Sequence, residues 1–409
     1  MKRLAVALLA FTTLACSADK SDDAAGGSSG GGSGSVDLTG AGATFPYPLY
    51  SKWLADYASQ KGVRINYQSI GSGGGIRQLS EGTVDFGASD SPMTDEDIAK
   101  AKGPVLHIPT VLGAVVVTYN LPGLKAPLKI TGEVLGDIFT GAIKKWNDPR
   151  LAALNPGVAL PTSDVLVVHR SDGSGTTFVF TDYLASASPR WAAGPGRGKE
   201  VPWPVGLGGK GNEGVAGQVK QTPGAIGYVE LAYAKQNALP FAAIRNAAGN
   251  FVLPSPDGMT AAASAVSANL PANTDYRLSI VNAPGAAAYP ISSFTWILLY
   301  EQQADSVKAR KLVDFLKWAL SEGEKQARIP GESEQPLPPP RDKKRMQKKA
   351  MRSPNHTLRA HLHRWPPFNA TSSHQDYFVT SSETTSSAFW VSLSTTTTRR
   401  RSGTGTNFR

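Results

Sequence analysis

The chain has 409 residues, of which 41% are hydrophobic and 18% are charged, which is enough for about two folded domains with apolar cores. This composition excludes a disordered chain and a chain built from membrane spans. The net charge of +10 suggests a nucleic-acid-binding protein, but residues 330–409 alone carry 13 Lys and Arg against 5 Asp and Glu. Residues 1–329 are therefore nearly neutral, and the charge argument applies only to the C-terminal tail.

The N-terminus has the pattern of an export signal. A short basic start precedes an apolar run over residues 4–14, which is too short to cross a bilayer because a spanning helix needs about 20 residues. The sequence TLAC at residues 13–16 resembles the bacterial lipobox, although Leu is usual where Thr13 stands. The resemblance implies that the thiol of Cys16 carries lipid in the mature protein; the alternative is an ordinary signal peptide with an incidental Cys. Residues 17–35 are rich in Ser and Gly and are expected to form a flexible tether between a membrane and the folded protein.

The middle of the chain alternates between short apolar runs rich in β-formers and segments with helical spacing. Runs typical of strands lie at residues 63–70, 105–118, 165–169 and 225–229. Apolar residues recur at helical spacing in residues 47–57 and 307–320. The alternation predicts an α/β architecture with mostly parallel sheets, beginning near Val36.

Three segments share one chemical pattern, in which small residues and a hydroxyl precede a predicted helix. They are GAGATFP at residues 40–46, GSGGG at 71–75 and RSDGSGTT at 170–177. Each can present a helix N-terminus, where free backbone N–H groups and the positive end of the helix dipole favour an anion. In the first segment Pro46 suits the first helical turn, with Thr44 at or near the N-cap. In the third, Arg170 adds a permanently charged fork that suits a tetrahedral oxyanion.

Each segment alone is more typical of a glycine turn with a capping residue. The glycine-rich runs also fail the nucleotide-binding patterns, since G-x-x-x-x-G-K-[ST] does not occur and no clear G-x-G-x-x-G opens a βαβ unit. Three such segments in one exported chain, one of them with both Arg170 and Asp172, nevertheless favour an oxyanion-binding protein.

Six ordered motifs cover most of the region that is predicted to fold. They are LTGAGATFPYPLYSKW, IGSGGGIRQL, VDFGASDSPM, VVHRSDGSGTTFVFTDYL, WPVGLGGKGNEGVAGQV and PGAIGYVELAYAKQN. In this order, over residues 38 to about 326, they closely resemble the phosphate-binding proteins of bacterial phosphate ABC transporters. The resemblance implies an α/β, two-lobed type II periplasmic-binding-protein fold with a hinge and an inter-lobe anion cleft.

The resemblance also implies a division of the chain into segments. These are a signal peptide with lipidated Cys16 at residues 1–16, a Gly/Ser linker at 17–35, a first lobe at 36–112 plus 290–329, a second lobe at 113–289, and a tail at 330–409. The chain is expected to cross between the lobes near residues 110–118 and 286–295, and a last helix at about 303–326 is expected to return to the first lobe. Phosphate is expected to bind between the lobes and to close them.

The tail departs from the family pattern. Residues 330–409 are basic and rich in Pro, Ser and Thr, with no sustained periodicity, and are predicted to be disordered. A change of reading frame in the source gene, or a basic appendage that binds anionic surfaces or nucleic acid, would each explain it. Disorder without a role is the preferred interpretation.

Carried over residue by residue, the ligands of the family fall on matching residue types. They are Thr44, Phe45 through its backbone N–H, Ser72, Asp90, Arg170, Asp172, Ser174, Gly175 and Thr176. Asp90 has a physical role in this set, because phosphate at neutral pH keeps a proton that a carboxylate accepts, whereas sulfate has no proton to offer. Asp172 is expected to orient Arg170 as an ion pair.

The folded part is not predicted to be an enzyme or to need a cofactor or a metal. Its histidines are His107 and His169, and no HExxH or other metal-ligand cluster occurs. His169 is the only candidate base near a serine nucleophile, and alternation along its strand places it on the face opposite Arg170. Packing or surface exposure therefore explains His169 better than catalysis does.

Two alternatives remain open. One is a receptor for another oxyanion, such as arsenate, sulfate or molybdate; Asp90 argues against the unprotonated ones and leaves arsenate. The other is a secreted phosphatase-like enzyme or an adhesion protein that reuses this fold.

The expected partners are inorganic phosphate, the permease and ATPase subunits of a phosphate ABC transporter, and a membrane through the lipid on Cys16. The chain is expected in the periplasm or the outer cell envelope, as a monomer that binds no nucleic acid.

Overall fold

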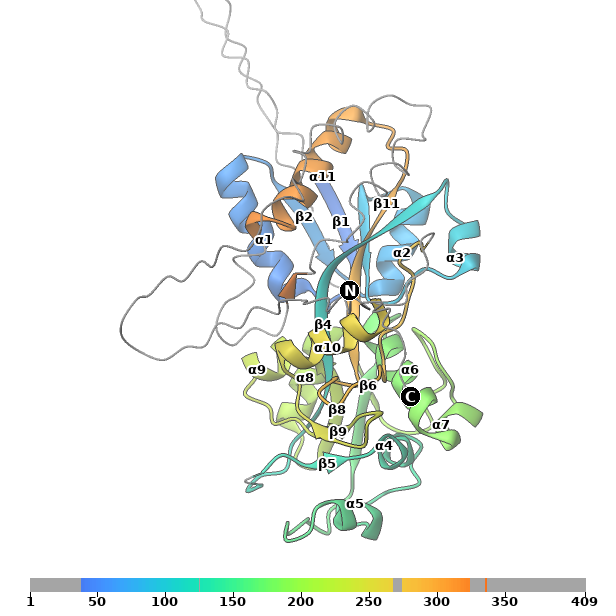
Figure 1. Cartoon of the computed structure of the whole chain (residues 1–409), viewed down its shortest axis with the longest axis vertical. Helices are drawn as coiled ribbons and strands as arrows, with labels where there is room; N and C mark the ends of the chain where they lie inside the picture. Colours follow the sequence, from blue (N-terminus) through green and yellow to red (C-terminus); the bar gives the residue numbers. More distant parts are fainter. Residues whose placement is uncertain (1–37, 125, 268–273, 324–334, 337–409) are drawn as a thin grey trace, which may run out of the picture. The chain divides into compact units, whose positions relative to one another are not determined.

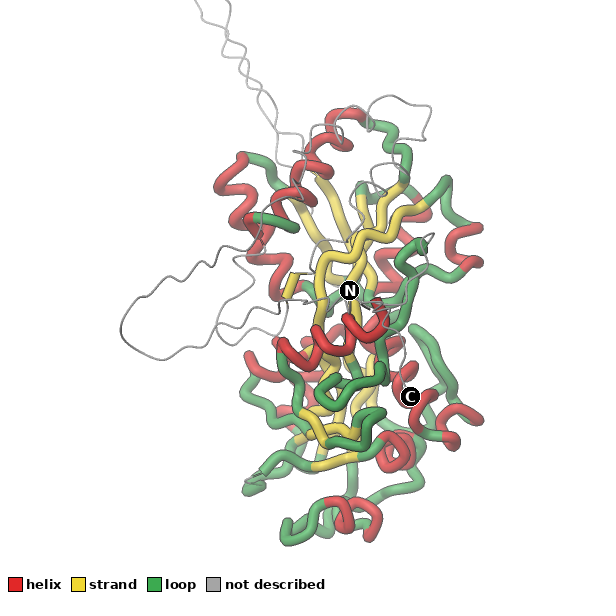
Figure 2. The backbone as a smooth tube through the Cα atoms, viewed as in Figure 1, coloured by secondary structure: helices red, strands yellow, loops and turns green. Residues whose placement is uncertain are grey.

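A computed structural model describes residues 38–124, 126–267, 274–323 and 335–336 of the chain, all within one compact unit (Figure 1, Figure 2). Strands and helices alternate along this region, so the α/β prediction is confirmed. The expected strands correspond to β2 (Ile65–Ser69), β4 (Val105–Tyr119), β6 (Leu166–Arg170) and β8 (Ala225–Glu230). The two segments with helical spacing correspond to α1 (Tyr47–Lys61) and α11 (Ser306–Ala319).

The main sheet runs in the order β2-β1-β3-β11-β4-β8-β6-β7. The other strands in this order are β1 (Leu38–Gly42), β3 (Phe86–Ser89), β7 (Leu207–Gly209) and β11 (Ser292–Tyr300), and the short β12 (Gln335–Pro336) joins the same sheet beside β4. β1 pairs in parallel with β2 and β3, and β6 pairs in parallel with β7 and β8.

The centre of the sheet is antiparallel. β11 pairs antiparallel with both β3 and β4, and β4 pairs antiparallel with β8. The prediction of mostly parallel sheets is therefore wrong for the central strands. The reason is topological. β4 leads the chain from a first group of strands (β1, β2 and β3) to a second group (β6, β7 and β8), and β11 leads it back in the opposite direction (Figure 1).

Helices lie beside both groups of strands (Figure 1). Those near β1, β2 and β3 are α1, α2 (Ser72–Glu81), α3 (Asp95–Ala99) and α11. α6 (Gly175–Ala187), α8 (Gly211–Gln221) and α9 (Leu231–Gln236) pack against β8, and α4 (Gly132–Phe139) and α7 (Pro189–Ala193) pack against α6. α10 (Pro256–Ser267) lies against β4 and β11, and α5 (Pro149–Leu154) lies beside a small second sheet (Figure 1). This second sheet has the order β10 (Phe251–Val252), β9 (Ala243–Arg245) and β5 (Lys129–Ile130).

An aromatic cluster forms the core beside the first group of strands. The ring centroid of Tyr57 on α1 lies 5.2 Å from that of Phe315 and 5.2 Å from that of Trp318, both on α11. All three side chains are buried, and full burial of a large apolar side chain stabilises the fold by roughly 1.5–3 kcal/mol. α11 therefore packs against α1 and covers this core.

The three expected helix N-termini are present, but they are capped differently. Ser174 caps α6 with its side chain, since its hydroxyl accepts a hydrogen bond from Thr177 N at 3.0 Å. Gly71 precedes α2 and Pro46 precedes α1, neither with a side-chain cap. Thr44 lies near the N-cap of α1, two residues before Pro46, but its hydroxyl accepts from Asn212 at the start of α8 and does not cap the helix.

One short part of the tail is described. β12 (Gln335–Pro336) pairs antiparallel with β4, with Gln335 opposite Leu112. The rest of the tail, the predicted signal peptide with Cys16 and the linker lie outside the described residues.

Candidate functional site

Arg170, the last residue of β6, supplies the positive charge of the site. Its side chain is 1% exposed and donates twice to Asp172, from Nε to Oδ1 at 2.8 Å and from Nη2 to Oδ2 at 2.5 Å. Burial raises the pKa of Asp172, but the hydrogen bonds and charge of Arg170 outweigh it, and the pKa is lowered overall. The predicted ion pair is present, and it leaves Nη1 of Arg170 to donate to Thr176 Oγ1 at 3.3 Å.

The N-terminus of α6 lies beside this guanidinium. Ser174, Gly175 and Thr176 are all buried there. Among the described residues, the backbone N–H groups of Gly175 and Thr176 have no acceptor, as is usual in the first turn of a helix. Together with the helix dipole, these N–H groups form a donor set suited to an anion.

Asp90 follows β3 and brings a buried carboxyl group to the same place. Burial raises its pKa to about 7, against smaller lowering effects from Thr295, Arg170 and Ser72. Thr295 Oγ1 donates to Oδ1 of Asp90 at 2.6 Å, and the backbone N of Asp90 donates to Ser72 Oγ at 3.3 Å. Asp90 thus brings a buried carboxyl group with a raised pKa to a site whose other ligand groups, apart from Asp172, are hydrogen-bond donors.

Thr44 and Phe45 follow β1 and complete the site on the side of Asp90. Thr44 is 3% exposed and Phe45 is fully buried. Thr44 Oγ1 accepts from Nδ2 of Asn212 at 2.7 Å and from the backbone N of Asn212 at 3.3 Å. The backbone N–H of Phe45 has no acceptor within the part of the chain that the structure describes.

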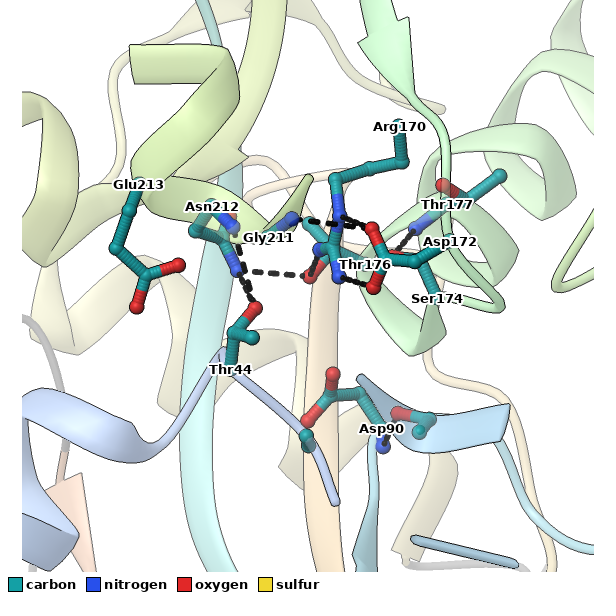
Figure 3. A network of polar contacts seen from close by, with 12 residues as sticks. Thr44, Asp90, Arg170, Asp172, Ser174, Thr176, Thr177, Gly211, Asn212 and Glu213 are labelled. Carbon is teal, nitrogen blue, oxygen red and sulfur yellow. Dashed lines mark hydrogen bonds and ion pairs between the residues drawn. The ribbon is translucent and has the colours of Figure 1, made fainter. Parts of the chain in front are cut away.

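The residues of the site come from two sides of the molecule: Thr44, Phe45, Ser72 and Asp90 on one, and the segment from Arg170 to Thr176 on the other. Figure 3 shows Asn212, beside the second set, bonded to Thr44 of the first. A Cβ added to Gly175 would lie 2.5 Å from Ser72 Oγ and 2.7 Å from Asp90 Oδ2. Nearby, the backbone N of Gly73 donates to the carbonyl oxygen of Gly173 at 2.8 Å. The structure therefore brings together every site residue that the sequence predicts.

A cavity of about 860 Å³ opens beside the contact between Gly73 and Gly173 and is lined by α2 and by charged side chains of both signs. Of the predicted site residues only Asp172 lines this cavity; Arg170, Asp90 and Thr176 do not. The polar groups of the site are buried, so their geometry and not this cavity defines the site.

Two polar residues of the site were missed by sequence reasoning. Asn212, at the start of α8, links Thr44 to Thr176, and Thr295, on β11, holds Asp90. Asn212 lies within one of the recognised motifs, but nothing in its local pattern predicts contacts with residues far away in the sequence. Thr295 lies within an apolar strand, where a hydroxyl gives no signal of its own.

The two histidines take no part in these contacts. The ring of His169 stacks on that of Trp203, with the ring centroids 4.7 Å apart. His107 is buried, and its Nε2 accepts from the backbone N of Met93 at 3.1 Å. Within residues 38–323, excluding the gaps at 125 and 268–273, no group of His, Cys, Asp and Glu could hold a metal ion.

Comparison with known proteins identifies the family of the chain. The model of the PBP superfamily domain matches residues 24–323. The phosphate-binding protein PstS of Xylella fastidiosa strain 9a5c is 48% identical over 294 residues, which cover 72% of this chain and 80% of the relative. PstS of Pasteurella multocida strain Pm70 is also 48% identical, over 287 residues that cover 70% of this chain and 82% of the relative. The chain belongs to the PstS family of phosphate-binding proteins.

The fold agrees with this membership. The crystal structure of a phosphate-binding protein from Stenotrophomonas maltophilia matches with a TM-score of 0.53 at 20% identity, covering 70% of this chain and 84% of that one. The expected two-lobed binding-protein fold is thus confirmed, and the PstS family consists of binding proteins and not enzymes. None of the described helices is both long and apolar enough to cross a membrane.

Proposed function

We propose that the chain binds inorganic phosphate outside the cytoplasm and delivers it to a phosphate-importing ABC transporter, without chemistry on the ligand. The names of the PstS relatives support this proposal. The observation that carries it is the composition of the site, in which one buried carboxyl group, Asp90, faces a set of hydrogen-bond donors. A ligand that is both an anion and a proton donor satisfies both, and protonated phosphate is such a ligand.

The proposed ligand groups divide by their chemistry. Arg170 supplies positive charge through the guanidinium that Asp172 orients. Phe45, Gly175 and Thr176 supply backbone N–H groups. Hydroxyl donors come from Thr44, Ser72, Ser174 and Thr176, and Asp90 accepts the proton that phosphate retains.

Selectivity for phosphate over sulfate follows from the carboxylate of Asp90, which acts as a hydrogen-bond acceptor. Sulfate carries no proton, so above pH 7, where Asp90 is a carboxylate, the sulfate oxygens would face that carboxylate without a hydrogen bond among buried groups. Such a mismatch costs orders of magnitude in affinity when the polar groups are buried. Arsenate keeps a proton as phosphate does, and this mechanism does not discriminate against it.

Replacement of the buried cation tests the proposal. Arg170→Ala in the full chain removes the charge and several donors, and phosphate affinity should fall by at least about 100-fold in calorimetric titrations. Arg150→Ala is the matched control, because Arg150 pairs with Asp137 and Asp148 on the surface with its side chain 45% exposed. Equal phosphate affinity of the wild type and Arg170→Ala would refute this site.

We further propose that the protein is a monomer, tethered to a membrane by lipid on Cys16 and docked to the permease and ATPase subunits of the transporter. The lipobox-like sequence and the Ser/Gly-rich residues 17–35 support the tether. Labelled palmitate should enter the wild type in cells and should not enter Cys16→Ser. Labelling of both, or of neither, would contradict the lipid anchor.

A further inference from the structure

Asn212 lies between two of the proposed hydroxyl ligands and has no exposed surface (Figure 3). It belongs to the first turn of α8, directly after Gly211. Its side chain contacts Thr44, which follows β1, and Thr176, which lies on α6. One side chain thus touches both sets of residues that form the site.

The orientation of the Asn212 amide is determined by its third partner. The backbone N of Glu230 can only donate, and it lies 2.8 Å from Oδ1 of Asn212. The NH₂ group of Asn212 must therefore face the two threonines, with Nδ2 at 2.7 Å from Thr44 Oγ1 and at 3.1 Å from Thr176 Oγ1. Each hydrogen of the NH₂ group serves one threonine.

Both hydroxyl oxygens are fully used as acceptors. A hydroxyl has two lone pairs and one hydrogen. Thr44 Oγ1 accepts from Nδ2 and from the backbone N of Asn212, and Thr176 Oγ1 accepts from Asn212 Nδ2 and from Arg170 Nη1. Each hydroxyl can then act only as a donor, and neither has an acceptor among the residues that the structure describes.

We propose that Asn212 is a positioning residue, which directs the hydroxyl hydrogens of Thr44 and Thr176 toward the bound oxyanion and joins the two sides of the site around it. The inference rests on the proposed phosphate site. It assigns Asn212 no contact with phosphate, since both hydrogens of its NH₂ group are already donated to the threonines. The bond from Asn212 to Thr44 also ties α8 to the loop after β1, so it forms only when the two sides are together.

A double-mutant cycle on phosphate affinity tests this role. Asn212→Ala should weaken phosphate binding by about 30-fold, because two hydroxyls lose the partner that orients them. In a Thr44→Val, Thr176→Val background the same change should cost less than about 3-fold, since no hydroxyl remains to be oriented. An equal loss in both backgrounds, or wild-type affinity of Asn212→Ala, would overturn the proposal.

Two further variants guard against effects on folding. Asn212→Asp keeps the shape and the acceptor for Glu230 N but has no NH₂ group, and it should weaken binding at least as much as Asn212→Ala. Asn155→Ala is the matched control, because Asn155 is also buried and bonds to the backbone of Lys129 and Leu151, away from the site. Asn155→Ala should lower thermal stability and leave phosphate affinity unchanged. Wild-type phosphate affinity of Asn212→Asp would overturn the proposal even if Asn212→Ala failed to fold. Lack of phosphate binding by the folded wild type would instead refute the proposed function.

Discussion

The hydroxyl of Thr295 donates a hydrogen bond of 2.6 Å to Oδ1 of Asp90, and both residues are buried. Thr295 reaches Asp90 from β11, which pairs with β3, and the register of β11 against β4 shifts between Thr295 and Trp296. The bond occupies Oδ1 and leaves Oδ2 beside Ser72 and Gly175, where the two sides of the site meet. One oxygen of the carboxyl group is thus anchored to the sheet, and under the proposed function the other accepts the proton of phosphate.

Loss of this anchor should weaken phosphate binding. Thr295→Val removes the hydroxyl and keeps the shape, and it should raise the pKa of Asp90 further because the Thr295 hydrogen bond lowers it. We expect about 10-fold weaker phosphate binding at pH 8 in calorimetric titrations, with Thr295→Ser close to the wild type. Thr118→Val is the control, since Thr118 is a buried threonine whose hydroxyl donates to Pro240 O instead. Unchanged affinity of Thr295→Val would show that the Asp90 carboxyl group is positioned without it.

Burial of Asp90 should also make stability depend on pH in the absence of phosphate. Its pKa is raised from 3.8 to about 7, so between these values the folded state keeps a proton that the unfolded state has lost. The free energy of unfolding should therefore fall as pH rises from 4 to 8, by at most about 4 kcal/mol from this group. Urea unfolding of the wild type and of Asp90→Asn in a phosphate-free buffer isolates this effect. The same pH dependence in both proteins would contradict a raised pKa.

A methyl group at Gly175 should keep the two sides of the site apart. The added Cβ would lie 2.5 Å from Ser72 Oγ and 2.8 Å from Asp90 Cβ, closer than such atoms approach. Phosphate affinity of Gly175→Ala should fall more than about 10-fold, whereas thermal stability should change little because the clash is relieved by separation of the two sides. Gly217→Ala is the control, because Gly217 lies in the middle of α8 with no atom within 4 Å of an added Cβ. This variant should leave the free energy of unfolding unchanged or raise it by about 0.5–1 kcal/mol. Tight phosphate binding by Gly175→Ala would contradict the observed proximity.

The ion pair between Lys199 and Asp97 should slow phosphate release. Nζ of Lys199 lies 2.6 Å from Oδ2 of Asp97 on α3, and the carbonyl of Lys199 accepts from the backbone N of Ser174, so the pair connects α3 to the site. Both side chains are about one fifth exposed, and partly exposed pairs contribute up to about 1 kcal/mol. Lys199→Met should raise the phosphate dissociation rate about 2- to 5-fold in stopped-flow measurements, and less at high salt.

The control for this variant is Lys145→Met. Lys145 pairs with Asp164 at 3.0 Å, with both side chains more than half exposed and away from the site. Its dissociation rate should equal that of the wild type. If the phosphate dissociation rate of Lys199→Met also equals that of the wild type, the ion pair between Lys199 and Asp97 does not stabilise the bound state.

The sequence predicted the parts of the site that are local. The run from Arg170 to Thr176 contains a charge, its partner Asp172 and a helix start within a few residues, so its geometry follows from short-range chemistry. The strands and the two long helices could be predicted for the same reason, because hydrophobic periodicity is a property of neighbouring residues.

The parts that could not be predicted depend on strand order and register. Thr295 reaches Asp90 only because β11 lies next to β3 in antiparallel pairing, and the sequence suggested mostly parallel sheets. Asn212 meets Thr44 across 168 positions in the sequence. The local pattern placed Thr44 near the N-cap of α1, but its hydroxyl accepts a hydrogen bond from Asn212 and caps no helix.

A calorimetric titration of the full chain, freed of bound ligand, with phosphate and then with sulfate tests the proposed phosphate site most directly. At pH 8 we expect tight binding of one phosphate per chain, no heat from sulfate, and no displacement of phosphate by sulfate. Sulfate binding as tight as that of phosphate, or no phosphate binding by a folded sample, would contradict it.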